Sequence, residues 1–101
     1  MRYLFLLNPT AGKRDCTAEL APAIQAAAQR AGIPPEKRKV VVTQYAGHAR
    51  ELAAEAAHTA QADGEPVRIW TAGGDGTFNE ALTGAQGCSL AAVGCLPFGS
   101  G

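Results

Sequence analysis

The residues best suited to chemistry in this 101-residue chain form a glycine-rich turn, Gly-Gly-Asp-Gly-Thr-Phe-Asn, at residues 73–79. Three glycines in its first four positions let the backbone turn tightly and approach a ligand without a Cβ atom in the way. A strand-like run, 67–72, precedes the turn, and a helix-like stretch starts at Thr77. Free backbone N–H groups and the positive end of a helix dipole should therefore point at the turn. This combination predicts a phosphate-binding site.

Asp75 is the unexpected residue of this turn, because a carboxylate repels phosphate unless a metal ion or a proton offsets its charge. One interpretation makes it a carboxylate near the γ-phosphate of a nucleotide, linked to Mg²⁺ or handling a proton. The other makes it the N-terminal cap of the following helix. A cap explains an aspartate but not the glycines around it, so we favour the functional interpretation and expect nucleotide chemistry rather than passive anion capture.

The elements that must position this turn follow from the apolar pattern. Four runs of apolar or β-branched residues are typical of strands: 3–7, 39–43, 67–72 and 90–96. Two stretches with alanine at helical spacing, 17–31 and 49–60, are typical of helices, and 77–83 is expected to be a short third helix. Their alternation predicts an α/β domain, a Rossmann-like three-layer αβα sandwich with a mostly parallel sheet. Ligands gather at the carboxyl ends of such strands, and four of these ends carry conspicuous loops: 8–12, 43–47, 73–79 and 98–101.

Composition limits the classes of function. With 47% apolar residues, 18% charged residues and a formal net charge of zero, the chain fits one folded domain and not a bulk nucleic-acid binder. Cys16, Cys88 and Cys95 have no CxxC spacing, so we expect neither a metal cage nor disulfides, and we interpret the thiols as core residues of a reduced, cytoplasmic protein. No apolar run is long enough for a transmembrane segment.

Several residues near the loops carry separate expectations. Lys13 either reaches a phosphate as a point charge or is solvated, and the sequence favours neither. Glu80 is interpreted as an acid of the first helical turn with a supporting role, and His48 as a helix-start residue rather than a catalytic base. Trp70 is expected in the core rather than stacked on a nucleotide base. Gly84 is expected to end an element.

Two common nucleotide-binding patterns are absent from the sequence. The Walker pattern needs a glycine where the chain has Leu7 and a serine or threonine where it has Arg14. The dinucleotide fingerprint needs a third glycine where the chain has Asn79. The glycine turn therefore belongs to a different class of loop.

The stretch GGDGTFNEALTG, residues 73–84, resembles the GGDGT motif shared by diacylglycerol kinases, sphingosine kinases, bacterial lipid kinases and NAD kinases. Three further segments resemble lipid-kinase motifs in the family's order. They are Asn8-Pro9-Thr10-Ala11-Gly12 for N-P-x-[SA]-G, Thr43 with Gly47-His48-Ala49 for T-x3-G-x-A, and Leu96-Pro97-Phe98-Gly99-Ser100-Gly101 for the start of P-x-G-[TS]-[GA]-N-D. NAD kinases usually lack the first of these segments, so the lipid-kinase branch is favoured.

This resemblance implies a site for ATP with Mg²⁺. It implies that Asp75 organises ATP and its metal as the catalytic residue of this chain, while no residue is assigned as a direct metal ligand. It also implies a set of nucleotide-binding residues: Asn8, Pro9, Thr10, Ala11, Gly12, Thr43, Gly73, Gly74, Asp75, Gly76, Thr77, Phe78, Asn79 and Ser100.

In the lipid-kinase family that this chain resembles, the lipid site and the general base lie in a larger C-terminal β-rich domain. No part of residues 1–101 corresponds to that domain. We therefore expect residues 1–101 to be the N-terminal ATP-binding domain of a longer kinase, a fragment that alone has no measurable lipid kinase activity. The whole enzyme would transfer the γ-phosphoryl group of ATP to a hydroxyl of diacylglycerol or a sphingoid-like lipid.

Two alternatives stay open at this point. One is a stand-alone nucleotide-binding or assembly module without catalysis, whose partner is another copy in a homo-oligomer. The other is an NAD kinase-type domain. If the chain belongs to a lipid kinase, we expect that enzyme in the cytoplasm, either free or bound peripherally to the inner membrane surface.

Overall fold

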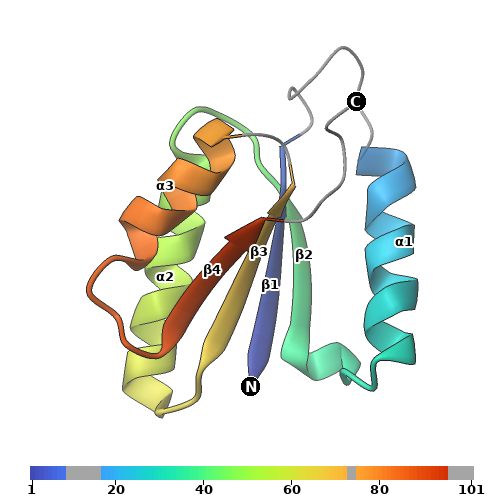
Figure 1. The fold of residues 1–101 in the computed structure, drawn as a ribbon, viewed down its shortest axis with the longest axis horizontal. Helices are drawn as coiled ribbons and strands as arrows, with labels where there is room; N and C mark the ends of the chain where they lie inside the picture. Colours follow the sequence, from blue (N-terminus) through green and yellow to red (C-terminus); the bar gives the residue numbers. More distant parts are fainter. Residues whose placement is uncertain (9–16, 73–74, 96–101) are drawn as a thin grey trace.

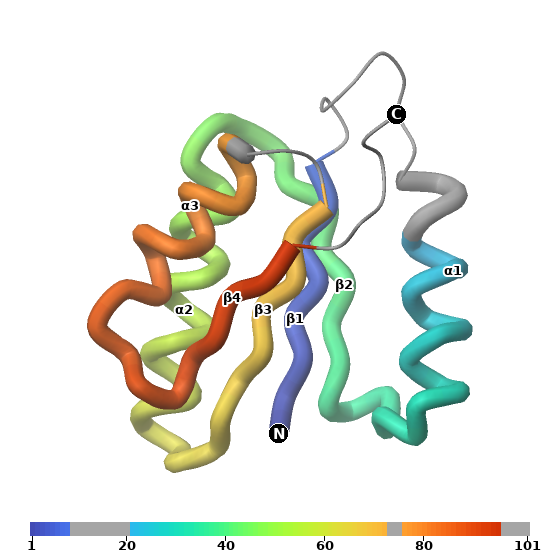
Figure 2. Tube along the Cα trace, viewed as in Figure 1, coloured from blue at the N-terminus to red at the C-terminus, as the bar shows by residue number. Residues whose placement is uncertain are grey.

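The computed structural model describes residues 1–8, 17–72 and 75–95, and the side chains of 17–20 and 75 lie outside that description. The described residues form a four-stranded, all-parallel sheet with helices on both faces (Figures 1 and 2). The strands are β1 (Arg2–Leu7), β2 (Arg38–Val42), β3 (Val67–Ala72) and β4 (Ala91–Cys95). The helices are α1 (Thr17–Arg30), the 3₁₀ helix η1 (Pro35–Lys37), α2 (His48–Asp63) and α3 (Asp75–Ala85). The predicted α/β alternation is confirmed.

Strand β1 lies inside the sheet, whose order is β2-β1-β3-β4. Its continuous apolar sequence explains this place, because a strand covered on both faces needs apolar side chains on both. The register pairs Leu7 with Val42 on one side and with Ala72 on the other. The carboxyl ends of β1, β2 and β3 are therefore level, and the loops that follow them start at one edge of the sheet.

Helices α2 and α3 cover one face of the sheet and pack against Leu4, Leu6 and Ile69. Their buried residues are mostly alanines, which let the two helices approach closely. Gly84 lies inside α3, where a Cβ atom would stand 2.2 Å from the backbone carbonyl oxygen of Arg50 on α2. The expectation that Gly84 ends an element is wrong; it is a glycine because two helix backbones meet there.

Helix α1 covers the other face, beside β2 in Figure 1, and contributes Ile24 to a cluster with Phe5, Leu7 and Ala72. Trp70 packs half-buried against this cluster. Its ring lies over Gly94, where a Cβ atom would come within 2.6 Å of it. Trp70 is thus a packing residue, as expected, although it is not fully enclosed.

The prediction that the cysteines lie in the core is wrong for Cys95, which is exposed. Cys95 is the last residue of β4, and β4 is an edge strand of the described sheet, so its side chain has fewer neighbours than those of β1 or β3. Cys88 is half-buried and donates to the carbonyl oxygen of Ala57 at 3.4 Å. Cys16 lies outside the described residues.

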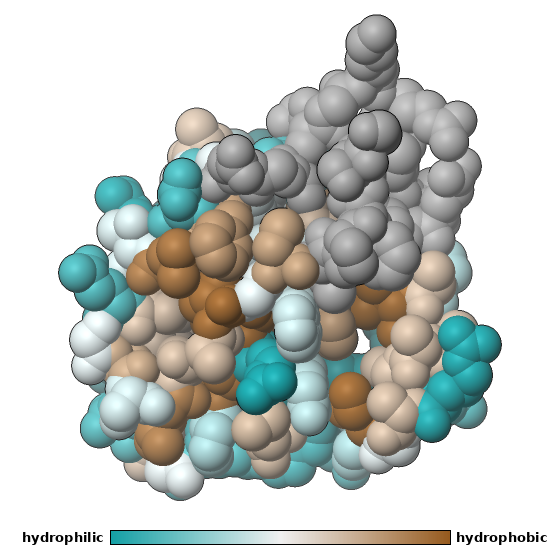
Figure 3. All heavy atoms as spheres, viewed as in Figure 1, coloured by the Kyte–Doolittle hydropathy of each residue, from teal (hydrophilic) through white to brown (hydrophobic). Residues whose placement is uncertain are grey.

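On the face seen in Figure 3, apolar side chains gather over α3 and β4. A shallow hollow there is lined by Leu82, Ala85, Ala91 and Val93 together with polar residues of α3. None of the helices in the described ranges is long and apolar enough to cross a membrane.

Candidate functional site

The backbone joins three strand ends at the carboxyl edge of the sheet. The Asn8 N–H donates to the Ala72 carbonyl oxygen at 2.9 Å, and the Thr43 N–H donates to the Leu7 carbonyl oxygen at 2.8 Å. The Thr43 hydroxyl donates to the same Leu7 oxygen at 3.3 Å. Thr43 is a buried residue, only 8% exposed. The start of the 8–12 loop, the start of the 43–47 loop and the end of β3 are thus held side by side.

A side-chain hydrogen bond connects two of the motifs that the sequence analysis singled out. The Asn8 Nδ2 donates to the Thr77 Oγ1 at 3.0 Å, across 69 positions of sequence. Thr77 is 4% exposed and lies in the first turn of α3, which begins at Asp75. The bond fixes the end of β1 against the helix that follows the glycine turn.

A second link joins α3 to the loop before α2. The Gly47 N–H donates to a carboxylate oxygen of Glu80 at 3.3 Å. Gly47 is the N-cap residue of α2 and has a φ of 89°, a left-handed conformation that favours glycine. Glu80 therefore links α3 to the start of α2. It lies in the second turn of α3, which begins at Asp75, so the expectation of an acid in the first turn is wrong.

His48 begins α2, as expected, and its ring is engaged with the backbone. The Gln44 N–H donates to His48 Nδ1 at 2.9 Å, and the His48 N–H donates to the Tyr45 carbonyl oxygen at 3.1 Å. These bonds close the 43–47 loop onto the start of the helix. A ring nitrogen that accepts a backbone N–H is not available to take a proton from a substrate, which agrees with a structural interpretation of His48.

These links surround a hollow of about 560 Å³, which we call the carboxyl-end hollow. Its described lining contains one carboxylate, Glu80, no lysine or arginine, and otherwise apolar or neutral polar residues. The lining residues are Asn8, Val42, Thr43, Gln44, Tyr45, Ala46, Ala49, Gly76, Thr77 and Glu80. Helices α2 and α3 both begin beside it, so backbone N–H groups and the positive ends of two helix dipoles lie at its wall. Such a lining suits the oxygens of an anion held by neutral donors.

Of the residues predicted to bind a nucleotide, the structure brings Asn8, Thr43, Gly76 and Thr77 together around this hollow. Phe78 and Asn79 lie on α3 outside its lining; Asn79 lines the shallow hollow over α3 and β4 instead. The remaining predicted positions lie outside the described residues or side chains: Pro9, Thr10, Ala11, Gly12, Gly73, Gly74, Asp75 and Ser100.

Sequence reasoning did not single out Gln44 or Tyr45 as site residues. Both stand inside the T-x3-G segment, at positions where the pattern specifies no residue type. An aromatic side chain in a loop otherwise made of small and polar residues was the available signal.

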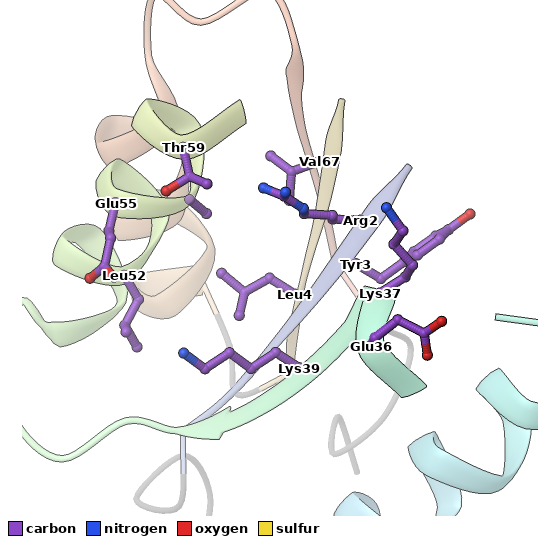
Figure 4. Close-up of a pocket in the computed structure, with 11 residues that line it drawn as sticks. Arg2, Tyr3, Leu4, Glu36, Lys37, Lys39, Leu52, Glu55, Thr59 and Val67 are labelled. Carbon is purple, nitrogen blue, oxygen red and sulfur yellow. The ribbon is translucent and has the colours of Figure 1, made fainter. Parts of the chain in front are cut away.

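A second hollow, of about 240 Å³, lies at the opposite edge of the sheet between α2 and the starts of β1, β2 and β3 (Figure 4); we call it the amino-end hollow. Its lining residues are Arg2, Tyr3, Leu4, Glu36, Lys37, Lys39, Leu52, Glu55, Ala56, Thr59 and Val67. Apolar side chains from the sheet and α2 line it together with charged ones, among them the cations of Arg2, Lys37 and Lys39.

Two of these three cations already have carboxylate partners. Arg2 pairs with Asp63 at 2.7 Å and with Glu65 at 3.1 Å, and Lys37 pairs with Glu65 at 2.7 Å. The Met1 amine also pairs with Glu65, at 3.1 Å. The hydrogen bonds from Lys37 and from the Met1 amine lower the pKa of Glu65 to about 2, and the hydrogen bond to Asp63 raises the pKa of Arg2. The charge of this edge is therefore largely satisfied within the protein.

Comparison with known proteins shows the family to which the chain belongs. The family model of the diacylglycerol kinase catalytic domain matches residues 2–101. The protein "Sphingoid long-chain bases kinase 1" of Arabidopsis thaliana is 35% identical over 106 residues. That alignment covers 98% of this chain and 13% of the relative, so the chain spans about an eighth of the relative's length.

Proposed function

Because the chain belongs to the diacylglycerol kinase catalytic domain family, a family of lipid kinases, we propose that it is the ATP-binding half of a lipid kinase. The observation that carries the proposal is the Asn8–Thr77 hydrogen bond. It places the start of the N-P-x-[SA]-G segment and the threonine of the GGDGT segment on the wall of one hollow, with Thr43 of the T-x3-G segment beside them. Three motifs that are far apart in sequence thus converge where α/β sheets bind ligands.

The proposed work of this chain is to position the phosphates. Asn8, Thr43 and Thr77 supply neutral donors and acceptors, and the starts of α2 and α3 supply backbone N–H groups. Such groups can hold the phosphate oxygens by hydrogen bonds without adding a charge to the site. In phosphoryl transfer the protein acts mainly by positioning and by electrostatic stabilisation.

Mg²⁺ is compatible with this lining. No group of three or more His, Cys, Asp or Glu within the described part of the chain is arranged to hold a metal ion. A nucleotide-bound Mg²⁺ needs only one or two protein carboxylates, because phosphates and water supply its other ligands. Glu80 provides a carboxylate in the hollow, and Asp75 begins the same helix. When bound, Mg²⁺ would offset the charge of the phosphates and so resolve the conflict that Asp75 otherwise creates.

The acceptor and its general base are proposed to belong to a further domain. Among the described residues that line the carboxyl-end hollow, Glu80 is the one carboxylate and none is a histidine, so the described lining offers no acid–base pair. We propose a lipid hydroxyl as the acceptor, of diacylglycerol or of a sphingoid base such as the relative's name states. The 101-residue chain alone is expected to bind nucleotide without phosphorylating lipid.

Titration of the ¹⁵N-labelled protein with ATP and, separately, with NAD tests the proposal, with Mg²⁺ present throughout. We expect saturable amide shifts with ATP that include Asn8, Thr43, Gly76 and Thr77. Shifts that saturate with NAD but not with ATP would overturn the lipid-kinase assignment in favour of an NAD kinase-type domain. ATP-dependent phosphorylation of diacylglycerol by the purified chain would contradict the division of labour between two domains.

A further inference from the structure

Tyr45 is an exposed aromatic side chain outside both core clusters. It lies in the loop between β2 and α2 and is 56% exposed, whereas the apolar residues of the two core clusters are largely buried. Leaving so much aromatic surface in water gains little for stability. Its place calls for an explanation other than core packing.

Three interactions hold the Tyr45 side chain and backbone in place. Its ring stacks on His48 with a centroid separation of 4.5 Å and an interplanar angle of 16°. Its carbonyl oxygen accepts the His48 N–H at 3.1 Å. Its hydroxyl hydrogen-bonds with the Glu51 carboxylate, which raises the pKa of Tyr45. His48 is itself fixed by the Gln44 N–H on its Nδ1. The ring is thus both exposed and oriented, which lowers the entropy cost of stacking a ligand on it.

Tyr45 lines the carboxyl-end hollow together with Asn8, Thr43 and Thr77. The hollow, at about 560 Å³, is within the size range of small-molecule pockets. A ligand whose phosphates occupy the neutral donors of Asn8 and Thr77 therefore has its remaining part close to the loop that carries Tyr45. A structural role as a cover for His48 explains the stacking, but it does not explain why the ring stands at the wall of this hollow with more than half of its surface exposed.

We propose that Tyr45, supported by His48, is the platform on which the purine base of the nucleotide stacks. This rests on the proposed function, because it assigns the base-binding part of the same site. Base–aromatic stacking is tolerant of base identity and grows with the stacked area. The structure thus predicts binding of both ATP and GTP, with weaker binding of UTP, whose base is smaller.

The test compares ATP with inorganic tripolyphosphate, which has the phosphates and no base. Dissociation constants are measured from amide shifts of the ¹⁵N-labelled protein, with Mg²⁺ present. Tyr45→Ala should weaken ATP binding by about fivefold to 150-fold and leave tripolyphosphate binding within about twofold. Tyr45→Phe, which keeps the ring, should restore most of the ATP affinity. Leu82→Ala is the matched control, because Leu82 is 43% exposed but lies outside the lining of the carboxyl-end hollow.

Each outcome has one meaning. Selective loss of ATP affinity in Tyr45→Ala, with the ATP preference over UTP also lost, supports the platform. Unchanged ATP affinity in Tyr45→Ala, where the wild type binds ATP, overturns the platform and leaves the proposed function standing. Equal weakening of ATP and tripolyphosphate overturns it too, since the residue then only shapes the loop. A wild-type protein that binds neither probe overturns the proposed function itself.

Discussion

The two edges of the sheet are built on different electrostatic principles. The amino-end hollow contains cations, and Arg2 and Lys37 are compensated by Asp63 and Glu65. The carboxyl-end hollow has no described lysine or arginine in its lining and presents hydroxyl, amide and backbone groups beside two helix starts. Charges that are paired inside the protein mainly stabilise it, whereas neutral donors fixed around a hollow keep hydrogen-bonding capacity for a ligand. The carboxyl edge is a candidate for phosphate positioning because neutral donors and two helix starts surround its hollow in the described part of the chain.

The largest effect on ATP binding is expected from a substitution of Thr77 in the carboxyl-end hollow. Thr77→Val keeps the volume but removes the acceptor of the Asn8 Nδ2 hydrogen bond, so the two motifs lose their connection. ATP affinity should fall by about tenfold to 100-fold, because the Thr77 hydroxyl is lost both as a hydrogen-bonding group for the ligand and as the partner that positions Asn8. Calorimetric or NMR titration measures the change.

Thr59→Val is the matched control, since Thr59 lines the amino-end hollow. If both threonine variants weaken ATP binding equally, the functional distinction between the two hollows is wrong.

Glu80 also separates the two edges, because it is the one carboxylate among the described residues that line the carboxyl-end hollow. Glu80→Ala removes the acceptor of the Gly47 N–H, and ATP affinity should fall by about threefold to fivefold; the effect is modest because the bond is long, at 3.3 Å. Glu80→Gln keeps an acceptor oxygen and removes a negative charge, so it should bind ATP as well as the wild type or better in the absence of Mg²⁺. Titrations with and without Mg²⁺ distinguish the two effects. Stronger loss in Glu80→Gln than in Glu80→Ala would contradict a positioning role for Glu80.

The smallest effect is expected at Glu65, in the ion pairs of the amino edge. Its pKa is lowered from 4.5 to about 2 in the folded protein, so the folded state favours the charged carboxylate. The resulting stability is present above pH 4.5 and is lost as the pH falls through about 2. Thermal unfolding of the wild type and of Glu65→Gln should therefore differ slightly at pH 7 and converge toward pH 2, with ATP affinity unaffected at pH 7. A difference in unfolding temperature that grows at low pH would show that the ion pairs do not act as described.

The order of elements was predictable from local patterns. The apolar run 3–7 predicted β1, alanine at helical spacing predicted α1 and α2, and the helix-like stretch 77–83 predicted α3, with boundaries close to those observed. Helix α3 starts at Asp75, two residues before the expected Thr77, so Asp75 and Gly76 belong to the helix. The fold class follows from such patterns because hydrophobic periodicity is set by each segment's own geometry.

The alternation of strands and helices and the parallel α/β class therefore followed from the sequence alone, while the suitability of the strand-end loops for phosphate stays a prediction. Only the tertiary structure decided which loops are neighbours. The order β2-β1-β3-β4 brings Asn8 beside Thr77, places Tyr45 at the wall of the hollow, leaves Cys95 exposed on an edge strand and requires a glycine at 84. These outcomes depend on contacts between segments far apart in the chain, and no local pattern encodes how such segments pack together.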